Sequence, residues 1–454
     1  MRAIRLICWC ACGLALGAAA GVGAVAAAGS VAGPSPPDRD TARIIDVGHL
    51  PPLLRAAGDA AMLRFNVFCP GAVEGEPCDA AGDVFIRAGT AGAFGKIPLR
   101  RTDDVADGRY VAEVPPDLAA SPEGFSYYAV LRNEATGASL TVPSAGAAAP
   151  QLSLPLADAV VVHLAEHRFG STRHTDARVV QAPWGSAPGR AGLLHGPTFG
   201  PIGPSAFDVA ANGDVAVLDQ VNRRVERWHA GQHAGDIPVD VTGGIADMAL
   251  EADGAIDVLE PGGESRTPEL HSFAPSGALR WKAPIADRTW SQLRVGPQGP
   301  EVQQEPSEQW MPAPRLTPAA QASRGHPGRT LASGKELVVF RAGTSEARIA
   351  EVSGGRVKRA WRIVSATPLG EVQLAEPLDN GVVVVLRPYT ETQDEFLVLV
   401  LGARGVERSF GVDSADWAET APLARFRLAG SALYQLGSTP NAMHVDRFDL
   451  EVNR

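Results

Sequence analysis

Short strands separated by glycine turns recur through the second half of this chain, and this repetition constrains the fold more than any other feature. A strand–turn–strand unit occurs in loose form at residues 247–259, 378–386 and 426–434. Turn glycines at Gly231, Gly277, Gly355 and Gly405 are spaced by 46, 78 and 50 residues, so a degenerate unit is expected near residues 290–330. Repeats of this length with about four strands each predict a β-propeller.

The clearest unit is residues 204–228, which reads as strand, Asn-Gly turn, strand, polar turn and strand. It resembles an NHL repeat, the unit of a family of β-propellers. The resemblance implies that Asp219, Asn222 and Arg224 brace the turn between two strands. The unit departs from the family pattern at Asp208 and Ala210. The matching positions are Pro204, Val209, Asn212, Gly213, Val215, Val217, Asp219, Asn222, Arg224 and Val225.

The end of the chain bears on how the ring closes. After Gly411 only three strands are expected, and a blade left with an open edge is unfavourable. Residues 176–181 could supply the missing strand from the N-terminal side. The sequence therefore predicts a propeller over residues 176–454, with six blades closed by this strand, and five or seven as alternatives.

The segment before the propeller reads as a separate all-β domain. Residues 44–143 contain about six short strands divided by turns, which favours an antiparallel β-sandwich, immunoglobulin-like at the level of analogy. Residues 144–175 are rich in Ala and Pro at their start and are predicted to be a linker. The expected strands are residues 61–68, 83–87, 96–101, 109–115, 125–132 and 140–142.

The N-terminus has the pattern of an export signal. Arg2 and Arg5 precede an uncharged run with small residues at its end, so residues 1–28 are predicted to be a signal peptide and residues 29–43 a flexible leader. The run is also long enough to be an uncleaved membrane anchor. Export to the periplasm or the extracellular space agrees with the cysteines, because only Cys69 and Cys78 lie beyond the signal, and they are predicted to form a disulfide.

Net charge and the absence of common catalytic motifs exclude several classes of function. A formal net charge of −10 argues against nucleic-acid binding, since phosphates would be repelled. The sequence contains no nucleophile elbow, phosphate-binding loop or His-Glu-x-x-His motif. Residues 297–327 hold seven prolines and are interpreted as a binding loop on one face or as a disordered insertion.

Three polar residues share a position in the repeat register. Asp208, Asp247 and Gln292 precede their turn glycines by five to seven residues, which places them on the innermost strands that line a propeller's channel. There they could hold a cation, calcium being the one that carboxylates suit, or a polar ligand. Alternatively they pair with arginines or face channel water.

The leading hypothesis is an exported, non-catalytic binding or scaffolding protein for a protein, peptide or glycan partner, with no resident cofactor. The competing hypothesis is a metal-dependent hydrolase, lactonase or lyase with its site on the propeller axis. A purely structural envelope protein is the third interpretation.

Overall fold

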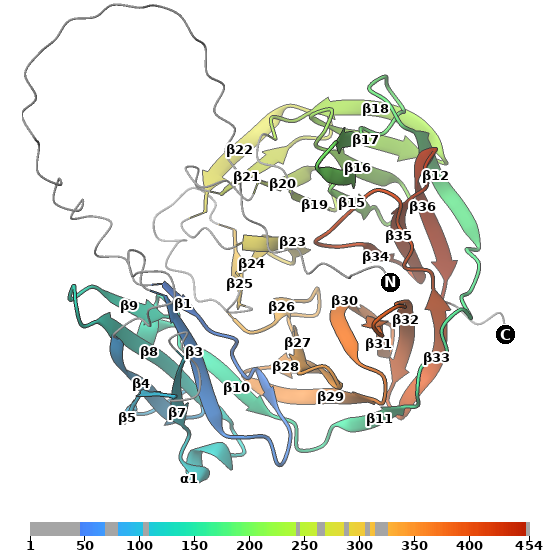
Figure 1. Ribbon diagram of the computed structural model, residues 1–454. Coiled ribbons are helices and arrows are strands. Elements are labelled where there is room, and N and C mark those ends of the chain that lie inside the picture. Colours follow the sequence, from blue (N-terminus) through green and yellow to red (C-terminus); the bar gives the residue numbers. More distant parts are fainter. Residues whose placement is uncertain are drawn as a thin grey trace, which may run out of the picture.

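The structure is a computed structural model that describes residues 46–68, 80–102, 109–241, 246–260, 268–285, 290–304, 309–313 and 326–450. It confirms the all-β prediction: within these ranges the only helical elements are α1 (Pro116–Ala119) and the 3-10 turn η2 (Gly146–Ala148). A ring of sheets lies beside a smaller, separate group of strands (Figure 1). No helix in the described ranges is long and apolar enough to span a bilayer.

The N-terminal strands form two sheets around one core. The first has the order β1-β3-β7-β6 and the second β2-β10-β8-β4-β5, with β9 also paired to β8. Their facing side chains make one apolar cluster that includes Phe65, Ile86, Phe125 and Tyr127. The bounds are β1 Asp46–Gly48, β2 Leu54–Arg55, β3 Met62–Phe68, β4 Ala80–Ala88, β5 Gly95–Pro98, β6 Arg100–Arg101, β7 Arg109–Glu113, β8 Phe125–Asn133, β9 Ser139–Val142 and β10 Gln151–Pro155.

Six further sheets follow one another around the ring, which defines a β-propeller in the described part of the chain (Figure 1). Two regular blades come first: β15 (Ala206–Val209), β16 (Val215–Asp219), β17 (Arg224–His229) and β18 (Gln232–Pro238), then β19 (Asp247–Leu250), β20 (Ile256–Glu260), β21 (Glu269–Phe273) and β22 (Leu279–Pro284). The next has three strands, β23 (Trp290–Gly296), β24 (Gly299–Gln304) and β25 (Gln309–Pro312).

Three blades complete the ring. The fourth contains β26 (Arg329–Thr330), β27 (Glu336–Ala342), β28 (Glu346–Ser353) and β29 (Arg356–Ser365). The fifth contains β30 (Leu369–Leu378), β31 (Gly381–Pro388), β32 (Phe396–Gly402) and β33 (Gly405–Val412). The sixth contains β34 (Phe426–Ala429), β35 (Ala432–Ser438) and β36 (Ala442–Asp449).

Glycine sets the turns of the regular blades. Gly213 and Gly254 occupy the same turn in successive blades, with φ of 87° and 81°. A side chain is strained in this left-handed region, so glycine is the residue that lets the inner strand reverse tightly. The repeat seen in the sequence is thus a repeat of backbone geometry.

A segment N-terminal to the repeats straps three consecutive blades together. β11 (Val160–Leu164) pairs in parallel with β29, Thr172 bridges to Gly411 at the end of β33, and β12 (Ala177–Pro183) pairs antiparallel with β36. The strand predicted at residues 176–181 therefore supplies the fourth strand of the last blade. A hairpin of β13 (Leu194–Gly196) and β14 (Phe199–Ile202) connects the strap to β15.

Two expectations differ from the structure. Residues 144–175 are not a bare linker, because β10 joins a sheet of the sandwich and β11 joins a blade. The proline-rich residues 297–327 include β24 and β25, so their first part belongs to a blade, whereas residues 305–308 and 314–325 lie outside the described ranges. Cys69, Cys78, the predicted signal peptide and the predicted leader lie outside the described residues.

The sandwich rests on the blade β26–β29. Leu53, Leu54 and Leu154 pack with Val338, Ala350 and Val352 in one apolar cluster. Beside it, the buried Arg348 donates a 2.8 Å hydrogen bond from Nη1 to the carbonyl of Leu54 and one of 2.9 Å from Nη2 to Asp59 Oδ1. These contacts fix β2 and the turn that follows it against the propeller.

Candidate functional site

The inner strands of the ring carry the polar residues singled out from the sequence. Asp208 lies on β15, Asp247 on β19 and Gln292 on β23. These strands pack side by side around the axis, β15 against β19 and β19 against β23. The structure thus places all three residues on the inner wall and allows their partners to be identified.

Asp247 is fully buried and joins three blades. Its Oδ1 accepts a 3.0 Å hydrogen bond from Arg427 Nη2, and its Oδ2 accepts one of 2.8 Å from the Leu293 amide and one of 3.3 Å from Arg294 Nη1. Arg427 comes from β34 and Arg294 from β23. The Asp247 carboxylate therefore links the three blades, and because its oxygens already accept these hydrogen bonds, it has little capacity left to coordinate a metal ion.

Asp208 is held in a similar way. Its carboxylate accepts 2.8 Å hydrogen bonds from the amides of Val209 and Leu250 and lies 3.5 Å from Arg427 Nε. Loss of hydration raises the pKa of Asp208, and Arg427 opposes that rise. The sequence left open whether these residues hold a ligand, pair with arginines or face channel water. In the structure Asp208 and Asp247 are paired with arginines.

A cavity of about 390 Å³ lies beside this network. Its lining comes from β23 to β27 and β30, from Leu50 in the loop between β1 and β2, and from Pro422 and Leu423 before β34. Gln292, the third predicted residue, is part of this lining. The cavity therefore lies where the inner strands of three blades meet a loop of the sandwich.

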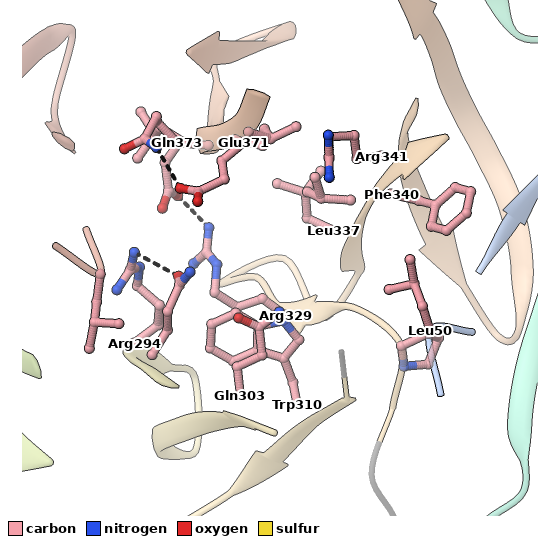
Figure 2. A pocket seen from close by; sticks show the side chains of 18 of the residues that line it. Leu50, Arg294, Gln303, Trp310, Arg329, Leu337, Phe340, Arg341, Glu371 and Gln373 are labelled. Atoms are coloured by element: carbon pink, nitrogen blue, oxygen red, sulfur yellow. Dashed lines mark hydrogen bonds and ion pairs between the residues drawn. The ribbon is translucent and has the colours of Figure 1, made fainter. Parts of the chain in front are cut away.

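The cavity has one side with two largely buried arginines and another on which Arg341 lies among apolar side chains. Figure 2 shows Arg294 and Arg329 on one side, and Leu337, Phe340, Arg341 and Leu50 on the other. Arg329 forms an ion pair with Glu376, and Arg294 Nη2 donates a 3.3 Å hydrogen bond to Gln292 Oε1. Burial, reinforced by the charge of Arg427, lowers the pKa of Arg294 to about 10, so Arg294 stays protonated at neutral pH.

Backbone irregularities shape the same wall. The pairing of β30 with β31 shifts register twice, between Leu369 and Val372 and between Val372 and Leu374, and the pairing of β23 with β24 shifts between Trp290 and Gln292. The inner-strand ladders at β15, β19 and β34 have no such shift along their described lengths. Bulges redirect side chains and are common beside functional sites. Here they place Gln292, Glu371 and Gln373 in the cavity wall.

The turn residues implied by the NHL resemblance lie together away from the cavity. Asn222 Nδ2 donates a 2.7 Å hydrogen bond to Asp219 Oδ2, and Arg224 Nε lies 3.4 Å from the same oxygen. Asp219 also accepts a 3.0 Å hydrogen bond from the Gly192 amide. This bond holds the segment between β12 and β13 against the turn. The arrangement stabilises a turn and exposes no reactive group.

Two groups of side chains within the described ranges could geometrically hold a metal ion, and neither includes Asp208, Asp247 or Gln292. One group is Glu226, His233 and Asp236, and the other is Glu260, Glu269 and His271. In the first, Arg224 Nη2 lies 2.7 Å from Glu226 Oε1 and Nη1 lies 3.3 Å from Asp236 Oδ2. Arginine thus already supplies the positive charge there.

Several residues of the site were not found from the sequence. Arg294, Arg329, Arg341, Glu371, Glu376 and Arg427 were not singled out, although Arg427 lies in one of the recognised repeat units. A charged residue inside an otherwise apolar inner strand is the signal that would have identified Arg427. The positions in β30 depend on bulges, which leave no pattern in the residues themselves.

The chain matches no known protein family, and no curated protein matches it in sequence. Solved structures with a similar shape include virginiamycin B lyase from Staphylococcus aureus, with 9% identity, 57% of this chain and 99% of that chain covered, and a TM-score of 0.34. Another is TolB from Acinetobacter baumannii, with 10% identity, coverage of 72% and 74%, and a TM-score of 0.28. Similarity at this level does not bear on activity, and the propeller is assigned from the sheet topology.

Proposed function

We propose that this chain is an exported, non-catalytic binding protein, built on an NHL-like propeller, that takes a protein or peptide partner at the axial cavity. The observation that carries the proposal is the coincidence of three features at one place. The cavity, the bulged inner strands and the sandwich loop that carries Leu50 all meet there. Binding sites concentrate in concave surfaces at domain junctions.

The chemistry of the cavity favours a polypeptide over a glycan. Sugar rings stack on broad aromatic faces that are open to solvent, and the one indole in the cavity lining, Trp310, is only 8% exposed. The lining instead mixes arginine, glutamate and glutamine with aliphatic side chains, as in sites that hold backbone amides and apolar side chains together.

A photo-crosslinking amino acid at position 50 tests this function. Leu50 is 60% exposed and lines the cavity, whereas Leu279 on β22 is 54% exposed and lies outside it, which makes position 279 a matched control. We expect one reproducible adduct from envelope extracts at position 50 and none at position 279. Equal labelling at both positions, or none at either, would contradict the proposal.

Export is a separate part of the proposal and rests on Arg2, Arg5 and the uncharged run that follows. Cell fractionation with N-terminal sequencing of the mature protein tests it. We expect a chain that begins near residue 29, outside the cytoplasm; an intact Met1 with a membrane-bound protein would indicate an anchor.

A metal-dependent enzyme is the competing function, and the arginine pairing of Asp208 and Asp247 counts against it. Elemental analysis of the purified protein separates the two. Stoichiometric calcium or zinc, lost together with a hydrolytic or lyase activity on chelation, would favour the enzyme.

A further inference from the structure

One arginine of the cavity has no acidic partner. Arg329 pairs with Glu376 and Arg294 with Asp247, so both of these guanidinium groups are matched. Arg341 is exposed and donates a single 3.3 Å hydrogen bond, to the carbonyl of Leu369; among the described residues no carboxylate lies within ion-pair distance of it. Its guanidinium fork can still receive a carboxylate in a bidentate manner.

The charge balance of the cavity agrees with an anionic ligand group. Arg294 is balanced by Asp247 and Arg329 by Glu376, so Arg341 and Glu371 are the charged lining residues that have no ion-pair partner among the described residues. An unmatched arginine beside an unmatched carboxylate suits a ligand that offers an anionic group to one and N–H donors to the other.

The wall formed by β30 can accept hydrogen bonds. Glu371 and Gln373 lie in the bulged part of β30, and Gln373 Nε2 donates a 2.9 Å hydrogen bond to Glu371 Oε2. Along the described chain, no arginine or lysine pairs with Glu371. Its carboxylate retains lone pairs that suit backbone N–H donors of an extended peptide.

Apolar side chains lie on the same side of the cavity as Arg341. Leu50 is 60% exposed there (Figure 2), and Leu337 and Val339 line the cavity from the face of β27 that also carries Arg341. An aliphatic or aromatic side chain of a ligand would be shielded from water there. A volume of about 390 Å³ suits a few residues of an extended chain and excludes a folded domain.

From this arrangement we infer that the cavity binds the free C-terminal end of a polypeptide, with the terminal carboxylate on Arg341, backbone amides on Glu371, and an apolar last side chain against Leu50 and Val339. The inference rests on the cavity being the partner site proposed above. The C-terminus can belong to a short peptide or to an intact protein, since the same three groups recognise either.

The test uses a pool of tripeptides that end in Leu, Phe, Ile or Val, each made with a free carboxylate and as the C-terminal amide. Calorimetric titration of the full-length protein is expected to show binding of the free acids and at least about tenfold weaker binding of the amides, as for loss of a charge-assisted hydrogen bond. Arg341→Gln removes this preference and Glu371→Gln weakens both forms. Arg132→Gln and Glu134→Gln, an exposed pair in the sandwich, leave binding unchanged.

A carrier protein that ends in the same residues separates the two sources. Binding to the carrier at the tripeptide affinity indicates an intact partner, whereas exclusion of the carrier indicates short peptides. Equal binding of acid and amide, or no binding of the pool, overturns the inference. If the adduct at position 50 is still obtained in that case, the proposed function stands and only the C-terminal recognition fails.

Discussion

Two buried acids of the first blades, Glu226 in β15–β18 and Asp257 in β19–β22, differ in pKa from Glu346 in the blade β26–β29. Burial raises the pKa of Glu226 on β17 to about 8 and that of Asp257 on β20 to about 7. On β28, burial alone would raise the pKa of Glu346, but hydrogen bonds from Arg362 and Arg348 lower it to about 2. At Glu226 and Asp257 the loss of hydration outweighs nearby positive charge, including that of Arg224 beside Glu226. At Glu346, in contrast, the two arginines outweigh the loss of hydration.

The inner walls of the same regions differ as well. On β15 and β19 the ladders are regular, and the carboxylates are enclosed by Arg294 and Arg427. On β30 the ladder is bulged and the polar side chains face a cavity. The same blade architecture therefore serves two purposes: the inner strands β15 and β19 stabilise the ring through buried ion pairs, and the inner strand β30 exposes polar side chains to a cavity.

The largest effect is expected at Asp247. Asp247→Asn leaves Arg294 and Arg427 without their shared carboxylate in a buried position, which should lower the free energy of unfolding by about 3–5 kcal/mol. Urea denaturation measures it. Glu371→Gln, on the cavity wall, serves as the comparison and should change stability by less than about 0.5 kcal/mol. Similar losses for both variants would remove the distinction between the two walls.

A pH effect of intermediate size is expected at Asp257. The carboxyl of the unfolded chain ionises near 3.8 and that of the folded chain near 7, so between these values only the folded state keeps the proton. Stability therefore falls as pH rises through this window, by about 1.4 kcal/mol per unit, and levels off above pH 7.

Asp257→Asn removes this dependence. Between pH 5 and pH 8 the wild type should lose about 3 kcal/mol more stability than the variant, as measured by urea unfolding at each pH. Parallel pH profiles of the two proteins would show that Asp257 ionises normally in the fold.

The opposite sign is expected at Glu346. Its pKa is lowered in the folded state, so its contribution is present above about pH 4.5 and is lost as pH falls toward 2. Glu346→Gln should cost about 1–3 kcal/mol at pH 7 and less than about half of that at pH 3, as measured by urea unfolding at each pH. A cost that does not depend on pH would mean that shape, rather than charge, explains the role of Glu346.

The smallest effect on stability is expected at Arg341. The side chain is exposed and makes one hydrogen bond to a backbone carbonyl, so Arg341→Gln should shift the melting temperature by no more than about 2 °C. Differential scanning calorimetry checks this. A large drop would show that Arg341 supports the blade rather than facing a ligand.

The sequence predicts strands and repeats well because both depend on local patterns. Alternation and glycine turns located the blades, and the missing fourth strand of the last blade indicated the segment that became β12. β10 and β11 were assigned to a linker because their partners lie far away in the sequence.

The site was predicted only in part. The register placed Asp208, Asp247 and Gln292 on inner strands, but their arginine partners come from other blades, such as Arg427 of β34. The cavity depends on the bulges of β30 and on Leu50 from the first domain. Neither a bulge nor a contact between domains leaves a local pattern in the residues.

The strap of β11 and β12 also decides where the molecule can associate with copies of itself. It covers the outer edges of β29 and β36, while the outer strands β18 and β22 have a neighbour on one side only in the described sheets. Such edges can recruit another strand. β22 presents Arg280 and Lys282 and ends at Pro284, and β18 ends at Pro238, features that repel or interrupt an added strand. Protection from aggregation is thus physical cover on one part of the ring, and charge and proline on the other.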